Sequence, residues 1–239
     1  MNLAVPQTIL VSGAAGGLGQ ALVAELARVG HRVLAGWHQS PLPPLPSGVE
    51  AVPLDVTCEA SCRAAVEQAL SRGGRIDAVI HAAGITRDAL LARQSPDDWG
   101  AVFAVNVDGA LRLGRATLPH LAEQGGGHWI AIGSHAGLAG SAGQAAYSAS
   151  KAALNGLVLS WAREFGGHNV RVNGVLPGVL PTSMTATLDS AVMRSYAEAN
   201  LLGRINDPVE VARFIAFLLT TANISGQLFS LDSRVHRWA

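Results

Sequence analysis

The sequence predicts a doubly wound α/β fold, in which a seven-stranded parallel sheet carries helices on both faces. Short apolar runs alternate with longer helical patterns along the chain, hydrophobic residues make up 49% and charged residues only 14%, and there are 27 glycines. The length of 239 residues is enough to bury one sizeable core. No internal repeat or linker interrupts the pattern, so we expect a single domain over residues 1–239.

Seven short runs rich in apolar and β-branched residues are predicted to be strands: residues 8–12, 32–37, 50–54, 78–81, 129–133, 170–175 and 227–231. Between them, apolar residues recur at helical spacing over residues 18–29, 58–71, 97–122, 146–165 and 208–221. Four prolines within residues 41–46 exclude a helix there and predict a stiff loop. Strands that alternate with helices are typical of a parallel sheet.

The charge pattern limits the kind of partner. The 17 basic residues balance the 17 acidic residues, so no overall field attracts nucleic acid or an anionic membrane surface. No apolar stretch reaches the ~18 residues of a membrane span, and no basic flank marks a signal peptide. Cys58 and Cys62 have the spacing of one helix face but no further metal ligands nearby. We therefore expect a cytoplasmic protein with inert thiols and no metal site.

A glycine-rich turn follows the first predicted strand. Residues 12–19 read Ser-Gly-Ala-Ala-Gly-Gly-Leu-Gly and lead directly into a predicted helix. Glycines let the backbone approach a phosphate closely, and the free N–H groups at the start of a helix attract that anion. The spacing from Gly13 to Gly17 and Gly19 is not the common GxGxxG. Its place after the first strand nevertheless favours a dinucleotide site over a simple tight turn.

Tyr147 and Lys151 lie one turn apart near the start of a predicted helix. A carbonyl that accepts hydride also needs a proton, and a phenol with a pKa of about 10 supplies it slowly unless a nearby cation lowers that pKa. Lys151 can be that cation. Ser134, at the end of the preceding predicted strand, could donate a hydrogen bond to the same carbonyl oxygen. Taken alone, the pair fits a surface aromatic beside a solvated lysine equally well.

Together these pieces resemble the short-chain dehydrogenase/reductase family over residues 8–232. The matching segments are residues 12–19, 55–56, 81–84, 106–109, 134, 147–151 and 173–178, in the family's order and approximate spacing. The resemblance implies a Rossmann fold and a nicotinamide-dependent oxidoreductase. Residues 84–91 and 202–208 look most like 3-oxoacyl-[acyl-carrier-protein] reductases and acetoacetyl-CoA reductases, which implies an acyl thioester as the substrate.

The resemblance implies four catalytic residues. Tyr147 would give the proton, Lys151 would bind the nicotinamide ribose and lower the tyrosine pKa, and Ser134 would orient the carbonyl. Asn106 would interrupt a helix and hold a water that links the lysine to solvent. The implied cofactor-binding residues are Gly13, Ala15, Gly16, Gly17, Leu18, Gly19, Trp37, His38, Asp55, Val56, Ala83, Gly84, Tyr147, Lys151, Pro177, Gly178, Val179 and Thr182.

Residues 182–204 are expected to form a mobile helical lid over the substrate, because Met184, Met193, Tyr196, Leu201 and Leu202 stand among polar residues there.

The end of the second predicted strand favours NADPH over NADH. It carries no Asp or Glu, which would bind the adenosine ribose hydroxyls and repel a 2′-phosphate. The basic residue that often follows the glycine turn in NADPH-dependent relatives is replaced by Ala15 and Gly16. His38 could pair with the phosphate when protonated, or could be a solvated loop residue.

Three segments depart from the reductase pattern. Ala82 replaces an Asn that braces the central strands, so weaker bracing is expected. Residues 124–128 and 166–168 lack the basic residues with which relatives dock a carrier protein, although Arg87, Arg93 and Arg204 could serve instead. Residues 232–235 replace a Gly-Gly pair, and the chain runs on to residues 236–238. This end often packs at subunit contacts in relatives, so either altered packing or a frayed end is expected.

The substrate could therefore be carried by acyl-carrier protein or CoA, and the chain could form a homotetramer, a homodimer or a mixed oligomer. Two alternatives stay open. One is an NAD(P)-dependent alcohol dehydrogenase or ketone reductase that acts on a free small molecule. The other is a non-catalytic subunit that pairs with another reductase.

Overall fold

Seven parallel strands form one sheet in the computed structural model, which describes residues 6–186 and 188–234. The strands are β1 (Thr8–Ser12), β2 (Arg32–Trp37), β3 (Val49–Pro53), β4 (Ala78–His81), β5 (Gly127–Ile132), β6 (Val170–Leu176) and β7 (Leu228–Ser230). Their order across the sheet is β3-β2-β1-β4-β5-β6-β7, and every neighbouring pair is parallel. The predicted fold class is confirmed. The tail at residues 236–238 lies outside the described residues.

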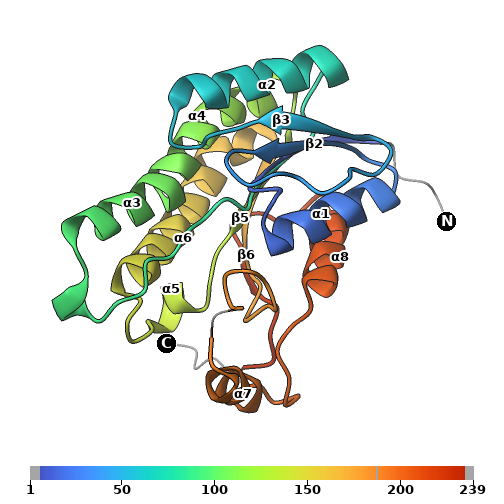
Figure 1. Cartoon of the computed structure of the whole chain (residues 1–239). Helices are drawn as coiled ribbons and strands as arrows, with labels where there is room; N and C mark the ends of the chain where they lie inside the picture. Colours follow the sequence, from blue (N-terminus) through green and yellow to red (C-terminus); the bar gives the residue numbers. More distant parts are fainter. Residues whose placement is uncertain (1–5, 187, 235–239) are drawn as a thin grey trace.

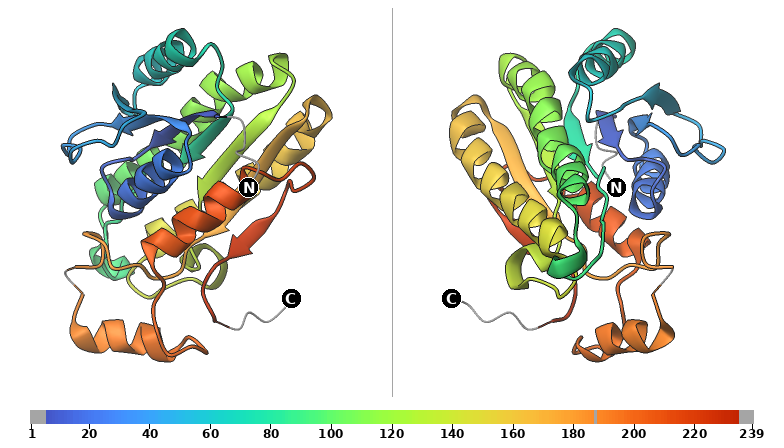
Figure 2. Two further views of the ribbon diagram at one scale, coloured as in Figure 1. Left: turned by 90° about the vertical axis from the view of Figure 1, so that its right-hand side faces the viewer. Right: turned by 60° about the vertical axis from the view of Figure 1, so that its left-hand side comes forward.

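The helices cover both faces of the sheet (Figures 1 and 2). They are α1 (Gly17–Arg28), α2 (Glu59–Gly73), α3 (Pro96–Asn106), α4 (Asp108–Glu123), α5 (Ala136–Ala139), α6 (Ala145–Phe165), α7 (Ser190–Glu198) and α8 (Pro208–Leu218), with short 3-10 turns at Leu91–Arg93 and Gly166–His168. The core on one face is built with α2, α4 and α6, and the core on the other face with α1 and α8. This is the doubly wound arrangement that the sequence predicts.

The single helix predicted over residues 97–122 is wrong, because the chain bends at Val107 and forms two helices, α3 and α4. Val107 has φ −106° and ψ −60°, yet its N–H still donates to the carbonyl of Phe103 and its own carbonyl accepts from the N–H of Leu111. The hydrogen bonds therefore continue through the bend. The residue before it is Asn106, whose position the family resemblance marks as a helix interruption.

Alternating side chains of each central strand enter the two cores. Leu10 of β1 packs with α2, α4 and α6, whereas its neighbours Ile9 and Val11 pack with α1 and α8. On β5, the fully buried ring of Trp129 lies edge-on to Trp161 of α6, with centroids 4.9 Å apart. Because both faces are buried, these strands are mostly apolar, which explains why apolar runs predicted them.

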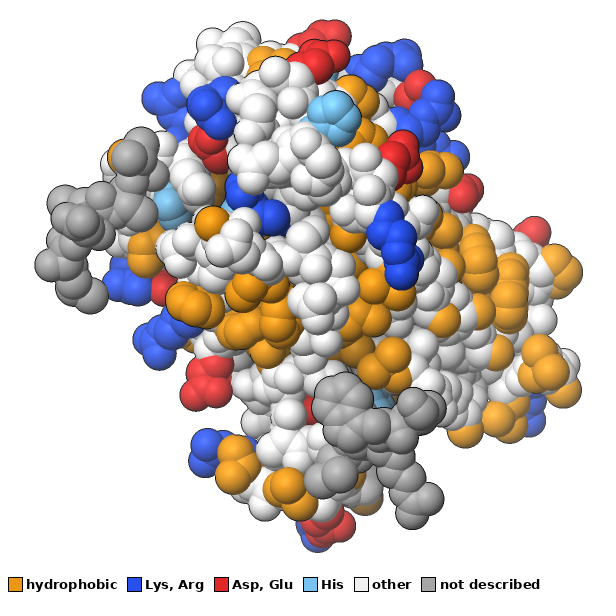
Figure 3. Space-filling model, turned by 180° about the vertical axis from the view of Figure 1, so that it is seen from behind, with side chains coloured by type: hydrophobic (Ala, Val, Ile, Leu, Met, Phe, Trp, Pro, Cys, Tyr) orange, Lys and Arg blue, Asp and Glu red, His pale blue; other side chains and the backbone are white. Residues whose placement is uncertain are grey.

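The surface mixes charges of both signs. The space-filling view from behind shows basic and acidic side chains interspersed, with patches of apolar side chains between them (Figure 3). Large apolar side chains that remain at least partly exposed occur on α3, α4, α6 and α8, and include Trp99, Leu111, Leu159 and Phe217. Within the described ranges, none of the helices has the length and apolar character needed to cross a bilayer.

The sheet topology determines where a ligand site can form. β1 and β4 are neighbours, but the chain leaves β1 toward β2 on one side and leaves β4 toward β5 on the other. The loops that follow them therefore diverge and leave a crevice at the carboxyl ends of the strands. The lid and the last described residues meet beyond the same ends of the strands, where the N–H of Leu202 donates to the hydroxyl of Ser233 over 3.1 Å.

We predict that Trp129→Ala lowers the free energy of unfolding by about 3–5 kcal/mol, because it removes a large side chain from a core that cannot collapse around the gap. Urea unfolding followed by far-UV circular dichroism measures the change. Trp99→Ala is the matched control, because Trp99 is already 38% exposed. An equal loss in both variants would contradict the assignment of Trp129 to the structural core.

Candidate active site

One cavity of about 1020 Å³ occupies the crevice at the carboxyl ends of the strands. The loops that follow β1 to β6 line it, together with the first part of the lid. Every residue predicted to bind the cofactor lines this cavity, and so do Ser134, Tyr147 and Lys151. Asn106 is the exception among the predicted site residues, because it is fully buried behind the cavity wall. Residues as far apart in the sequence as Gly13 and Thr182 are thus brought to one place.

The glycine turn between β1 and α1 is packed so tightly that it requires glycine. Gly13 has φ +69°, and a Cβ there would lie 2.6 Å from the backbone nitrogen of Ala83. A Cβ at Gly17 would lie 2.6 Å from the Thr182 side chain of the lid. No side chain caps the first turn of α1, whose preceding residue is Gly16. The N–H groups of that turn can therefore receive a phosphate of a dinucleotide.

The far end of the cavity lies beside the ends of β2 and β3. His38 places its Nε2 3.8 Å from Oδ2 of Asp55, while the other oxygen of Asp55 accepts hydrogen bonds from the N–H and hydroxyl of Thr57. Burial acts to raise the pKa of Asp55, but the Thr57 hydrogen bonds and the charges of His38 and Arg112 lower it to below its usual value. The ionised carboxylate can therefore hold His38 at the cavity wall.

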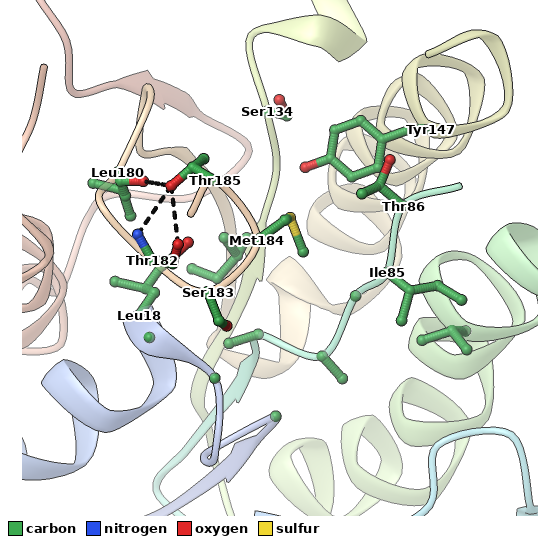
Figure 4. Close-up of a pocket in the computed structure, with 18 of the residues that line it drawn as sticks. Leu18, Ile85, Thr86, Ser134, Tyr147, Leu180, Thr182, Ser183, Met184 and Thr185 are labelled. Atoms are coloured by element: carbon green, nitrogen blue, oxygen red, sulfur yellow. Dashed lines mark hydrogen bonds between the residues drawn. The ribbon is translucent and has the colours of Figure 1, made fainter. Parts of the chain in front are cut away.

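Tyr147 lies in the first turn of α6, and its hydroxyl points into the cavity on the side of Ser134 (Figure 4). Burial raises the pKa of Tyr147, the hydrogen bond with Ser134 opposes that rise, and the negative charge of Asp88 adds to it. The net shift is upward. The phenol therefore keeps its proton over a wider pH range than a free tyrosine.

Lys151 is the only lysine in the sequence, and it is buried one turn after Tyr147. Its Nζ donates to the carbonyl of Ile132 over 2.8 Å and lies 5.6 Å from the centroid of the Tyr147 ring. Burial lowers the pKa of Lys151 to about 8. The lowering of the tyrosine pKa expected from Lys151 is not observed in this structure: burial raises that pKa, and the opposing contribution comes from the hydrogen bond with Ser134.

Asn106 braces the site from behind. Its Oδ1 accepts from the N–H of Ile85 over 2.8 Å, and its Nδ2 donates to the carbonyl of Ile85 and to the hydroxyl of Ser150. The same hydroxyl donates to the carbonyl of Tyr147 over 2.7 Å. Gly84 packs closely against the Asn106 side chain, since a Cβ on Gly84 would lie 3.3 Å from Asn106 Oδ1. The Asn106 side chain thus joins the loop after β4 to the helix that carries Tyr147.

Ser12 and His81 brace β1 against β4, where weaker bracing was expected from Ala82. The hydroxyl of Ser12 lies 3.0 Å from Nδ1 of His81 and accepts a hydrogen bond from the N–H of Ala83. The His81 ring also stacks on Trp129, with centroids 6.0 Å apart. Burial and the nearby charge of Lys151 lower the pKa of His81 to about 3, so this ring is neutral beneath the lysine.

The first part of the lid closes one side of the cavity. Thr185 donates from its hydroxyl to the carbonyl of Leu180 over 2.6 Å and accepts from the N–H of Thr182 over 3.0 Å, which holds these residues in a compact turn (Figure 4). Met184 and Tyr196 line the cavity as expected of lid residues. Leu201 and Leu202 do not, because they follow α7 and are 77% and 64% exposed.

Sequence reasoning missed several residues of the cavity wall, among them Ile85, Thr86, Asp88 and Gln144. Gln144 directly precedes the helix that carries Tyr147, so its place in the sequence could have indicated that it lies near the site. Asp88 lies within residues 84–91, which carry part of the family resemblance, but its contact could not be predicted from them because it joins segments 56 positions apart: its Oδ2 accepts from Nε2 of Gln144 over 2.8 Å.

The fold and this cavity define a dinucleotide-binding oxidoreductase, because a phosphate-binding turn and a tyrosine–lysine–serine group face one crevice. A model of the short chain dehydrogenase family matches residues 7–192. The 3-oxoacyl-[acyl-carrier-protein] reductase FabG of Thermotoga maritima is 36% identical over 233 residues, which are 93% of this chain and 95% of that reductase. The chain therefore belongs to the short-chain dehydrogenase family.

Two further comparisons agree with this assignment. Carbonyl reductase family member 4 of Danio rerio is 36% identical over 230 residues, covering 93% of this chain and 95% of that protein. A solved structure, described as ElxO with NADP bound, has a TM-score of 0.89 and 23% sequence identity, and the match covers 96% of this chain and 98% of that chain. The structural match supports the fold.

We predict that Lys151 titrates near pH 8 in the folded protein, against 10.5 for an ordinary lysine. Reductive methylation with carbon-13 formaldehyde gives a single side-chain NMR signal, because the sequence contains one lysine. The pKa is lower in the folded state, so the unfolded chain binds more protons between those values. The contribution of Lys151 to stability therefore rises as the pH rises through that window.

Lys151→Arg is the control for that titration, because it removes the side-chain signal and leaves only that of the α-amine. The same signal should move to a midpoint near 10.5 when the protein is unfolded in urea. A midpoint near 10 in the folded protein would show that the ammonium is solvated.

Proposed function

We propose that this chain reduces a 3-oxoacyl thioester to the 3-hydroxyacyl product with NADPH. The observation that carries the proposal is that Tyr147, Ser134 and Lys151 meet at the wall of the cavity that also contains the glycine turn. The resemblance of residues 84–91 and 202–208 to 3-oxoacyl thioester reductases supports the substrate class. The names of the similar reductases support it as well.

The residues fit a dinucleotide, because Gly13, Gly17 and Gly84 line one cavity and the first turn of α1 has no side-chain cap. When bound, the nicotinamide would supply hydride to the ketone carbon. Tyr147 transfers its phenolic proton to the carbonyl oxygen, and its raised pKa keeps that proton available. Ser134 orients the carbonyl by hydrogen bonding to the same oxygen. Lys151 holds the nicotinamide ribose and attracts negative charge that develops on the tyrosine.

Asn106 supports Tyr147 and Lys151 in two ways. Its side chain fixes Ile85 and Ser150, and so sets the distance between the loop after β4 and the helix of Tyr147. Its place at the end of α3, directly before the bend at Val107, supports the proposed water link from Lys151 to solvent. That link would return a proton to Tyr147 after each turnover.

A second function is favoured by one observation: Carbonyl reductase family member 4 is as similar to this chain as the reductase of Thermotoga maritima, at 36% identity. In this alternative, the same residues would reduce a free ketone or oxidise a secondary alcohol. We keep the thioester as the first choice, carried by acyl-carrier protein or CoA. A non-catalytic role as a partner subunit is disfavoured, because all four catalytic positions are filled.

The exposed apolar side chains on α3, α4, α6 and α8 support assembly into a homotetramer or homodimer, or a mixed oligomer. We expect the enzyme to act in the cytoplasm, because both of its cysteines, Cys58 and Cys62, are free thiols.

A substrate panel tests the proposed function. We predict that the protein oxidises NADPH rapidly with acetoacetyl thioesters of CoA and acyl-carrier protein, and slowly with a free ketone such as acetone. The loss of NADPH absorbance measures each rate. Tyr147→Phe is the control, because it removes only the phenolic hydroxyl. It should retain NADPH binding and lose turnover by about 10²–10⁴-fold.

Faster reduction of free ketones than of any thioester would favour the carbonyl reductase alternative. Near-normal turnover by Tyr147→Phe would show that another group supplies the proton. An absence of turnover with every substrate, together with tight binding to a second reductase, would favour the partner subunit.

The cofactor proposal depends on the ends of β2 and β3. No Asp or Glu directly follows β2, and His38, which can carry a positive charge, lines the cavity beside the end of that strand. We predict that His38→Ala weakens NADPH binding by about tenfold, because it removes the partner of the 2′-phosphate. NADH binding, which lacks that phosphate, should change little. Fluorescence titration of the reduced cofactors measures both constants.

Gln39→Ala, at the next position of the cavity wall, is the matched control for this measurement. Equal weakening of NADPH and NADH by His38→Ala would assign His38 to the wall of the adenine site. Tighter NADH than NADPH binding by the natural chain would overturn the preference for NADPH.

A further inference from the structure

A second set of contacts ties the loop after β4 to the turn before α6. Oδ2 of Asp88 accepts from Nε2 of Gln144 over 2.8 Å, and the N–H of Ala89 donates to the carbonyl of Gly143 over 2.9 Å. Oδ1 of Asp88 also accepts a hydrogen bond from the hydroxyl of Thr86. Both oxygens of Asp88 thus accept hydrogen bonds from neighbouring side chains. The two segments form one rim of the cavity.

Gln144 connects this rim to the helix that carries Tyr147. It is the residue before α6, and its carbonyl accepts from the N–H of Ser148 over 2.8 Å. Its side chain does not cap the helix but reaches across to Asp88. The position of the first turn of α6, and with it the position of Tyr147, is therefore linked to Asp88.

The charged and polar groups around Tyr147 come from four parts of the chain. Lys151 of the same helix lies beside the ring, Ser134 comes from the loop after β5, and Asp88 comes from the loop after β4. The lid adds Met184 and Tyr196 to the cavity. The side chain of the neighbouring Arg87 is turned toward Asp98, at 4.0 Å. Among the described residues, no ion pair neutralises Asp88.

We propose that Asp88 is a positioning residue of the active site, which fixes the first turn of α6 through Gln144 and whose negative charge favours the protonated phenol of Tyr147. The raised pKa of Tyr147, to which burial and Asp88 contribute, supports this. Because the phenol must be protonated to act as the acid, Asp88 would extend reduction toward higher pH. The kinetic consequence rests on the proposed function, whereas the effect on the ionisation of Tyr147 does not.

The ionisation of Tyr147 can be measured without turnover. The sequence contains 2 tyrosines, so Tyr196→Phe leaves Tyr147 as the only phenol. In that background, Asp88→Asn removes the charge but keeps an oxygen that can accept from Gln144. We expect the phenolate absorbance to appear at lower pH than in the parent. Asp97→Asn, in the first turn of α3, removes an equal charge away from the cavity and should leave the midpoint unchanged.

A midpoint that is unchanged or higher in Asp88→Asn, or one that falls equally in Asp97→Asn, would overturn the proposed charge effect. Far-UV circular dichroism at each pH confirms that the chain is folded. If unfolding precedes the phenolate signal, the pH profile of kcat with NADPH and acetoacetyl-CoA decides. The loss of rate at high pH should then move to lower pH in Asp88→Asn and stay in place in Asp97→Asn.

A double-mutant cycle tests the link between Asp88 and Gln144. We expect Asp88→Ala and Gln144→Ala each to lower kcat by about tenfold, because a displaced Tyr147 loses its alignment with the carbonyl. The double variant should be no slower than either single variant, since one link is lost in all three. Additive losses, or an unchanged kcat in Asp88→Ala, would overturn the positioning role. NADPH binding, measured by fluorescence, should be retained in every variant.

Discussion

The backbones of the β1 and β4 ends approach each other so closely that only glycine fits between them. A Cβ on Gly13 would lie 2.6 Å from the nitrogen of Ala83, and Gly13 also has the positive φ that disfavours other residues. The hydroxyl of Ser12 completes this contact with hydrogen bonds to Ala83 and His81. The glycine turn after β1 is thereby held against the end of β4, so that both segments line the cavity. The cavity has its shape because these two strands are neighbours.

The electrostatics of the site follow from burial combined with a few direct contacts. Burial lowers the pKa of Lys151 and raises that of Tyr147, so each shift favours the neutral form of the group. The carbonyl of Ile132 partly compensates the buried ammonium, and the ring below it, His81, is neutral and adds no repulsion. The tyrosine is consequently suited to hold a proton until a carbonyl oxygen accepts it. Ser134 and Asp88 shift the pKa of Tyr147 in opposite directions: the hydrogen bond with Ser134 lowers it, and the charge of Asp88 raises it.

The strands, and the placement of Tyr147 and Lys151 side by side at the cavity wall, could be predicted because their signals are local. A strand buried on both faces is an unbroken apolar run, and Tyr147 and Lys151 stand one turn apart on a single helix. The bend at Val107 could not be derived from apolar spacing, because the spacing continues across it and only the family resemblance marked it. The contacts of Ser12 with His81 and of Asp88 with Gln144 join residues 69 and 56 positions apart. Nothing in either local sequence indicates the partner, so these contacts needed the folded chain.

The hydrogen bonds at the end of the described chain link the last segment to the lid. Ser233 contacts Asn200 and Leu202, which directly follow α7, and Arg234 pairs with the buried carboxylate of Asp232 beside Gly178. β1, by contrast, begins at the amino ends of the parallel strands, on the side away from the cavity. A purification tag or fluorescent protein joined beyond residue 234 would therefore pull on the segment that is proposed to close over the substrate. One joined before β1 would lie away from that segment.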